Sequence, residues 1–169
     1  GNDCMVFGED GTTQLARFTF PRQAREGGLC IADFFRDVSD NVRDVIGLQV
    51  VTIGQHASEV AREWFAENRC QDYLYLHGLG VEMAEALAET VHKRIRAELG
   101  FAEEDAREMD KLLSQHYRGS RYSFGYPACP TLEDQGPLLR LLGAERIGIE
   151  LSDEFQLHPE QSTSAIVVL

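Results

Sequence analysis

Residues 117–130, which read YRGSRYSFGYPACP, constrain the fold more than any other stretch of the chain. Pro127 and Pro130 each lack a backbone N–H, and each disfavours a helical conformation for the residue before it. Gly119 and Gly125 permit turns, or a close approach of backbone to a ligand, that a Cβ atom would block. We therefore predict a rigid loop that is neither helix nor strand.

The same segment carries groups suited to a small ligand. It holds two arginines and four aromatic side chains, next to backbone N–H and C=O groups that a loop leaves free. A guanidinium can pair with both oxygens of a carboxylate, and an aromatic face can lie against a flat ring. These residues predict a binding site for a small molecule that has a carboxylate and a ring.

The overall composition is that of one globular domain, with 169 residues, 43% of them hydrophobic and 26% charged. The formal net charge of -12 argues against a surface for nucleic acid or for anionic membranes, because either would need clustered Lys and Arg. No apolar run approaches the length of a membrane span, and the first residues, GNDCMVF, lack the regions of a signal peptide. We expect neither nucleic acid nor a membrane as a partner.

The cysteines and histidines predict no metal site. The four cysteines are Cys4, Cys30, Cys70 and Cys129, which form no CxxC pair, and the five histidines show no HxxxH or HExxH spacing. Free thiols in a reducing cytoplasm are the simplest interpretation. Two prolines flank Cys129 and no histidine adjoins it, so a buried structural thiol is favoured over a nucleophile.

Strand patterns cluster near both ends of the chain. Residues 4–7 and 12–19 should form two strands joined by an Asp-Gly turn at 9–11, and residues 45–53 are apolar enough for a central, buried strand. Residues 147–151 and 165–169 read as further strands. With helices between the two clusters, this order predicts an α+β fold with a twisted, mainly antiparallel sheet and long helices.

Helices are predicted over residues 30–35, 58–68, 71–99, 102–116 and 132–142. Ser58 should cap the second of them, and Gly100 should end the long one. Two stripes run along this long helix. The apolar stripe, expected to face the core, comprises Met83, Leu87, Val91, Ile95 and Leu99. The stripe expected on the polar face comprises Glu85, Glu89, His92 and Arg96, with Glu89 paired on the surface to Lys93.

The decapeptide RYSFGYPACP resembles the RxxxGYPACP signature of the activation domain of cobalamin-dependent methionine synthase. Other segments resemble the family in the same order: CIADFF at 30–35, residues 47–54, QDYLYLH at 71–77 and AEALAETVHKRIR at 84–96. The resemblance implies a fold like that of this domain. Because the family domain is longer, residues 1–169 are expected to be part of a single such domain, with flanks missing at both ends.

The family domain binds S-adenosylmethionine (AdoMet), and the resemblance implies which residues would do so here. Arg121, the first residue of the signature, would pair with the methionine carboxylate. Ser123, Gly125 and Tyr126 match positions whose backbone or ring lies against AdoMet. Glu85 matches a glutamate on the face turned towards AdoMet and cobalamin, where a carboxylate would stabilise the sulfonium. The resemblance implies no catalytic residue and no metal ligand in this chain.

The resemblance also implies a function. The domain would present AdoMet while cob(II)alamin is reductively methylated to methylcobalamin, which reactivates an enzyme that transfers a methyl group from 5-methyltetrahydrofolate to homocysteine to give methionine. Cobalamin would be held by another domain of the same enzyme, and the electron would come from a flavodoxin-type donor. The isolated chain is not expected to be active alone. Two alternatives stay open: a non-catalytic docking module that caps a corrinoid protein without binding AdoMet, and a cysteine hydrolase that uses Cys129.

Overall fold

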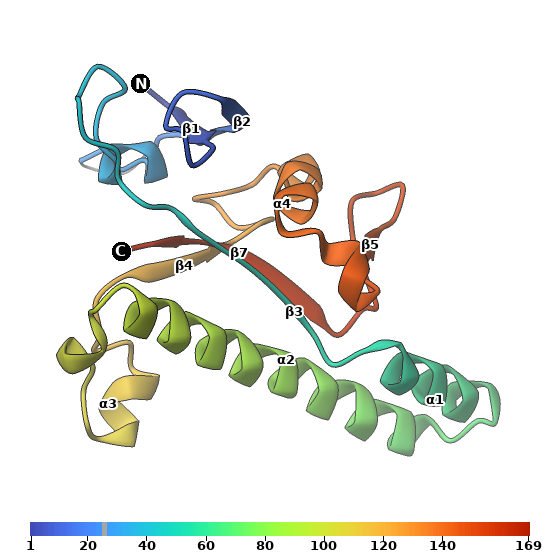
Figure 1. Cartoon of the computed structure of the whole chain (residues 1–169). Helices are drawn as coiled ribbons and strands as arrows, with labels where there is room; N and C mark the ends of the chain where they lie inside the picture. The colour runs from blue at the N-terminus through green and yellow to red at the C-terminus, as the bar shows by residue number, and fades with distance from the viewer. Residues whose placement is uncertain (25–26) are drawn as a thin grey trace.

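The computed structural model describes residues 1–24 and 27–169 (Figure 1). The strands and α-helices are, in chain order, β1 (Asp3–Phe7), β2 (Gln14–Thr19), β3 (Gly47–Thr52), α1 (Gln55–Ala66), α2 (Cys70–Glu98), α3 (Met109–Leu113), β4 (Ser120–Ser123), α4 (Gln135–Leu142), β5 (Glu150–Leu151), β6 (Leu157–His158) and β7 (Ser162–Val168). Short 3-10 helices are η1 (Ile31–Phe34), η2 (Ala102–Glu104), η3 (Leu132–Asp134) and η4 (Ala144–Ile147). The predicted α+β class with antiparallel pairing is confirmed.

The largest sheet among the described residues has three antiparallel strands in the order β3-β7-β4. The strand predicted over residues 45–53 is present as β3, but its expected central position is wrong. β3 lies at an edge of the sheet, and its buried and partly buried residues alternate. The centre is β7, whose Ile166 and Val167 are fully buried. Its run of apolar residues is typical of a strand covered on both faces.

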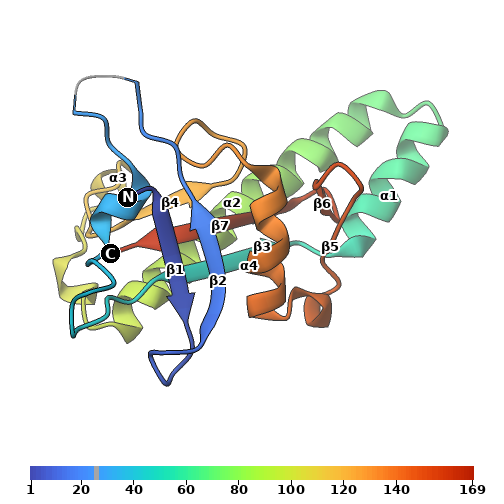
Figure 2. The ribbon, with the colours of Figure 1, turned by 90° about the horizontal axis from the view of Figure 1, so that it is seen from above.

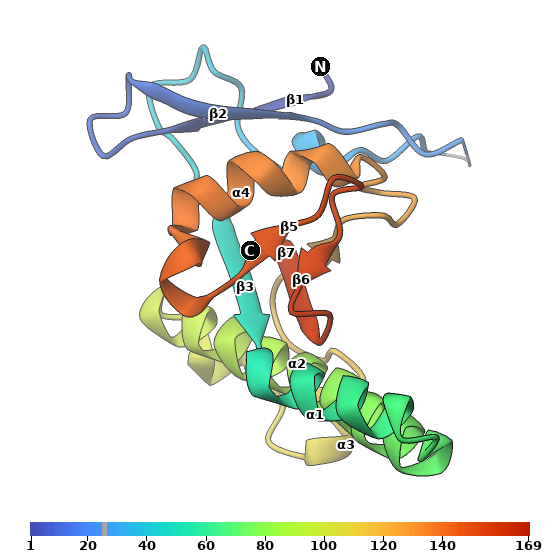
Figure 3. The same ribbon diagram turned by 90° about the vertical axis from the view of Figure 1, so that its right-hand side faces the viewer.

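The sheet separates two layers, as Figure 3 shows, with α2 on one face and the β1–β2 hairpin, η1 and α4 on the other. Successive residues of β7 point to opposite faces. Ile166 and Val168 join the core with Phe18, Phe20 and Leu138 on the hairpin side. The alternation therefore places Ala165 and Val167 on the face covered by α2.

The hairpin forms as the Asp-Gly signal predicts. Asp10 accepts the backbone N–H groups of Thr12 and Thr13 at 2.9 and 2.8 Å, and Gly11 adopts φ +66°. The hairpin crosses over the strands of the central sheet (Figure 2), which places Phe18 in the core. This arrangement covers the face of the sheet opposite α2.

Small side chains bring α2 close to the sheet. The buried residues of α2 are Gly80, Ala84, Ala88, His92 and Arg96. A Cβ atom on Gly80 would stand 2.8 Å from Ile53 Cδ1 and 2.9 Å from Gln161 Cγ, so a larger residue would force these side chains to shift where the helix passes the end of β3. The predicted apolar core stripe is wrong for Met83, Leu87 and Leu99, which are exposed, whereas Val91 and Ile95 are half-buried. The predicted polar stripe is also wrong in its last two members, because His92 and Arg96 are fully buried.

The ends of the first two helices show one correct and one wrong prediction. Gly100 ends α2 as predicted, with φ +86°, and its N–H donates to Ala97 O while Phe101 N–H donates to Arg96 O. Ser58 does not cap α1, which begins at Gln55. The Ser58 hydroxyl instead donates a hydrogen bond to Oε1 of Gln161, the residue just before β7.

Residues 102–116 do not form the continuous helix that was predicted. They contain η2 and α3, separated by a segment in which Asp105 turns back towards α2. Arg96 donates two hydrogen bonds to the Asp105 carboxylate, at 2.8 and 2.9 Å. This buried ion pair keeps the segment around Asp105 out of a helix. The sequence pattern of residues 102–116 is helical and gives no sign of the pair.

The loop predicted over residues 117–130 contains a strand. Ser120–Ser123 form β4 and pair with β7, so the prediction that the segment is neither helix nor strand is wrong for these four residues. Gly119 precedes the strand with φ +89°, and a Cβ there would stand 2.7 Å from Val168 O. Residues 124–130 remain a loop, as predicted.

The helix predicted over residues 132–142 is present as η3 followed by α4. Pro137 lies in the first turn of α4 as predicted, and Gly143 ends the helix with φ +60°. No helix among the described residues is long and apolar enough to cross a membrane.

Candidate ligand-binding site

The unequal lengths of β4 and β7 leave part of the sheet edge open. β3 pairs with β7 from Ser162 onwards, whereas β4 pairs with β7 only from Ala165 to Val168. Within the described residues, 162–164 therefore have a strand neighbour on one side only. A cavity of about 420 Å³ lies at this edge, between α2, the end of β4, η3 and the turn before β7. Its volume is within the range of small-molecule sites.

The signature loop forms one wall of this cavity. Gly125 N–H donates to Cys129 O and Cys129 N–H donates to Tyr126 O, both at 2.8 Å, which closes a tight turn with Pro127 at its second position. Gly125 has φ +89°, so a residue with a side chain would be strained there. Tyr126 lines the cavity and is 67% exposed. The turn thus holds an aromatic ring at the rim.

Three of the five residues predicted to bind AdoMet line the cavity directly: Glu85, Ser123 and Tyr126. Gly125 lies between two lining residues and supplies the turn. Glu160, which the sequence analysis did not identify, also lines the cavity and adds a second carboxylate to that of Glu85. The cavity is therefore acidic and suits a ligand with positive charge.

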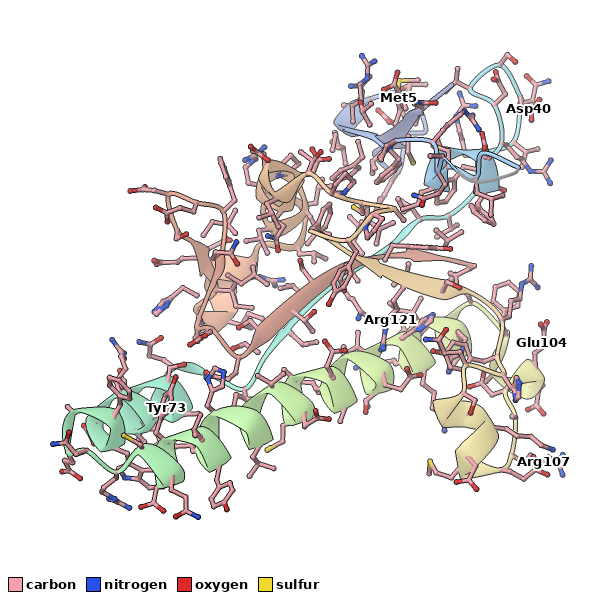
Figure 4. All side chains as sticks on the ribbon, turned by 180° about the vertical axis from the view of Figure 1, so that it is seen from behind. Met5, Asp40, Tyr73, Glu104, Arg107 and Arg121 are labelled. Carbon is pink, nitrogen blue, oxygen red and sulfur yellow. The ribbon has the colours of Figure 1, made fainter. Side chains whose placement is uncertain are left out.

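Arg121, the fifth predicted residue, does not line the cavity but stands beside it. It lies two residues before Ser123, on the same face of β4. Its guanidinium pairs with Glu89, with Nη2 3.2 Å from Oε2, and its side chain is 19% exposed. Its Nη1 atom is buried without a hydrogen-bond partner. In Figure 4, Arg121 occupies the space between β4 and α2.

The pairing of Glu89 corrects one prediction. Glu89 was expected in an exposed pair with Lys93, but its side chain is 25% exposed and lies against Arg121 and Tyr117. Glu85 and Glu89 are one helical turn apart, about 6 Å along α2. Arg121 and Ser123 are about 7 Å apart along β4. The Arg121–Glu89 pair therefore lies next to the part of the cavity that Ser123 and Glu85 line. It is one helical turn further along α2 and two residues back along β4.

A buried polar pair supports the base of the cavity. Ser164 of β7 donates to Gln135 Oε1 at 2.8 Å, and Gln135 Nε2 donates to Phe155 O at 2.8 Å. Both Ser164 and Gln135 line the cavity. No motif marks them, because their partners lie 29 and 20 residues away in the sequence.

Cys129 is not placed for nucleophilic chemistry. Its side chain is 1% exposed, and burial, with a smaller effect from Asp134, raises the pKa of its thiol to about 12. A thiol with this pKa is not ionised at neutral pH, which removes the basis of the cysteine hydrolase alternative. Among the described residues, no three His, Cys, Asp or Glu side chains are grouped as metal ligands would be.

Comparison with known proteins identifies relatives along the whole chain. The family model described as "Vitamin B12 dependent methionine synthase, activation domain" matches residues 1–169. The chain is 48% identical over 181 residues to the methionine synthase of Mycobacterium tuberculosis (strain ATCC 25618 / H37Rv), and 45% identical over 179 residues to that of Mycobacterium leprae (strain TN). Each match covers 99% of this chain but only 15% of the relative's length.

A solved structure agrees with the fold. The crystal structure of the MetH reactivation domain bound to AdoHcy superposes with a TM-score of 0.91 at 27% sequence identity. The superposition covers 99% of this chain and 54% of that chain. The fold predicted from the resemblance is thereby confirmed.

Proposed function

Because the chain belongs to the family of vitamin B12-dependent methionine synthase activation domains, we propose that it binds AdoMet in the cavity at the open edge of β7 and supports reactivation of a methionine synthase. One observation carries the choice of site: Glu85, Ser123 and Tyr126 line one cavity, and Arg121 stands next to it with an unpartnered Nη1. The related crystal structure contains AdoHcy, the product that AdoMet becomes after losing its methyl group.

The chemistry of the cavity suits AdoMet. AdoMet carries two positive charges, on its sulfonium and ammonium groups, and one negative carboxylate. Glu85 and Glu160 would face the positive groups, and Arg121 would pair with the carboxylate through Nη1. The adenine ring would lie against Tyr126 and the apolar Leu132, which also lines the cavity.

The contribution of the chain is to bind and orient AdoMet. In the whole enzyme, AdoMet would supply the methyl group and leave as AdoHcy, and an electron donor would supply the electron needed at the oxidised cobalamin. The turn at Gly125 and the base formed by Gln135 and Ser164 would fix the sulfonium in place. This role needs no acid, base or nucleophile from the chain.

The partners follow from the same proposal. The chain spans about 15% of the length of the methionine synthases it matches, so the other steps belong to other parts of such an enzyme. We propose that the domain meets a cobalamin-binding domain and a flavodoxin-type electron donor, in the cytoplasm. Methyl transfer from 5-methyltetrahydrofolate to homocysteine would be the reaction of the whole enzyme.

Calorimetric titration of three ligands tests the site at Arg121. AdoMet and AdoHcy carry the amino-acid carboxylate, and 5′-methylthioadenosine lacks it. Arg121→Ala should weaken AdoMet and AdoHcy by roughly 2–4 kcal/mol, and Arg121→Lys should recover only part of the loss because an ammonium lacks the planar fork. Both substitutions should leave the affinity for 5′-methylthioadenosine unchanged, because this ligand has no carboxylate. If the folded wild-type chain binds none of the three ligands, the AdoMet proposal is wrong and the docking alternative gains.

The acidic side chains should distinguish AdoMet from AdoHcy. Glu85→Gln and Glu160→Gln should each weaken AdoMet more than AdoHcy, because only AdoMet has the sulfonium charge. Glu82→Gln is a matched control, since Glu82 is exposed on α2 and outside the cavity. Equal losses for the two ligands would show that these carboxylates do not face the sulfonium.

A further inference from the structure

Glu89 is the centre of a largely buried ionic cluster beside the proposed site. Its Oε2 accepts a hydrogen bond from the Tyr117 hydroxyl at 3.1 Å and lies 3.2 Å from Arg121 Nη2. Arg96 Nη2 lies 3.8 Å from its other oxygen, Oε1. One carboxylate of α2 therefore contacts two guanidiniums and a phenol.

A second set of contacts fixes the far side of the cluster. The fully buried Arg96 donates two hydrogen bonds to Asp105, and its guanidinium stacks 3.8 Å from the centre of the Tyr117 ring. Glu89 and Asp105 balance the charges of Arg96 and Arg121. The four formal charges of this cluster sum to zero. Glu89 Oε1 accepts no hydrogen bond, so Arg96 attracts it through charge alone at 3.8 Å, while Oε2 pairs with Arg121.

The two ends of the Arg121 guanidinium have different surroundings. Nη2 is paired with Glu89, whereas Nη1 is buried without a partner. A buried donor without a partner is unfavourable and is satisfied by a ligand that brings an acceptor. An arginine side chain also has much rotamer freedom to lose on binding, so holding it in advance favours the complex.

From this geometry we propose that Glu89 is a positioning residue: by pairing with Nη2 it holds the Arg121 guanidinium beside the cavity and leaves Nη1 for the carboxylate of the ligand. The inference rests on the proposed function, because the ligand carboxylate is that of AdoMet or AdoHcy. Glu89 acts through Arg121 and does not touch the ligand.

The direction in which ligand affinity changes when Glu89 is removed distinguishes a positioning role from a purely electrostatic one. Glu89 also offsets the positive charge of Arg121, so on Coulomb's law alone its removal would strengthen the attraction for a carboxylate. If positioning dominates, its removal weakens binding instead. A ligand without a carboxylate should respond to neither effect.

The test is calorimetry of the 169-residue chain with AdoHcy and with 5′-methylthioadenosine. Glu89→Gln, which keeps the size of the side chain, and Glu89→Ala should weaken AdoHcy by about threefold and about tenfold or more, and change 5′-methylthioadenosine by less than about twofold. Glu98→Ala is the matched control, since Glu98 is an exposed carboxylate of α2 that pairs with Arg94. In an Arg121→Ala background, Glu89→Ala should have no further effect on AdoHcy.

Other results would contradict the role proposed for Glu89. Unchanged or tighter AdoHcy binding in folded Glu89→Gln would overturn the inference, and equal losses for both ligands would show a merely structural role. Absence of AdoHcy binding in the wild type would refute the proposed function and this inference together. Normal wild-type binding that depends on Arg121 but not on Glu89 would refute the inference alone.

Discussion

Acid should destabilise the fold through His92. This residue of α2 is fully buried, neither ring nitrogen is hydrogen-bonded, and its ring packs edge-on against Tyr117 with centroids 5.2 Å apart. Burial, followed by the nearby charges of Arg96 and Arg121, lowers the pKa of His92 from 6.5 to about 4. The imidazole is therefore neutral in the folded protein at neutral pH.

The size of the effect follows from this difference in pKa. The unfolded chain takes up a proton at His92 below about pH 6.5, whereas the folded chain takes it up only near pH 4. Since the unfolded state binds more protons between these values, the free energy of unfolding falls as the pH is lowered through this window. The full loss is on the order of 3 kcal/mol, because each pH unit contributes about 1.4 kcal/mol.

Urea unfolding at several values between about pH 7 and about pH 4.5 measures this dependence. His92→Phe keeps a flat ring against Tyr117 but cannot titrate, so its free energy of unfolding should fall less steeply with acid than that of the wild type. His56→Phe, which replaces a highly exposed imidazole on α1, is the control. Parallel curves for wild type and His92→Phe would refute the reasoning, whatever the absolute stability of the variant.

Two further substitutions test the packing around the site by urea unfolding. Gly119→Ala should lower the free energy of unfolding by about 2–4 kcal/mol, since it combines a positive φ with a backbone clash. Gly148→Ala, with φ +73° and open space around it, should lower it less, and equal losses would exclude the clash. Arg96→Met should lower it by about 3–5 kcal/mol because it leaves a buried carboxylate unpaired. Arg94→Met, which breaks an exposed pair, should change it by less than about 1 kcal/mol, and a similar loss in both would contradict the role of burial.

Local signals in the sequence predicted much of the fold. The Asp-Gly turn of the hairpin, the C-terminal glycine of α2 and the proline in the first turn of α4 each act within a few residues. Ser123 and Tyr126, which the resemblance at the signature loop implies as AdoMet contacts, line the cavity, and their role in binding stays a prediction. These features depend on backbone geometry that neighbouring residues determine.

The errors arose where distant partners decide the structure. Large apolar residues such as Met83 suggested the core stripe of α2, but the sheet requires a close approach that only small residues allow. Glu89 has a lysine four residues later, yet it pairs with Arg121, which is 32 positions away. Glu160 carries no motif and reaches the cavity only because β6 and β7 bring their connecting turn there. Periodicity contains no information about such partners.

Because β4 ends early, residues 162–164 of β7 keep an open edge that either a strand or a ligand can occupy. A longer β4 would continue along β7 and fill the open edge with its own backbone, so the same stretch of β7 can serve a strand or a ligand but not both. Gly125, with φ +89°, turns the chain away two residues after β4 ends. Gly125 does not line the cavity, yet its positive φ is needed for recognition, because it keeps the chain's own backbone out of the edge of β7 that a ligand would use.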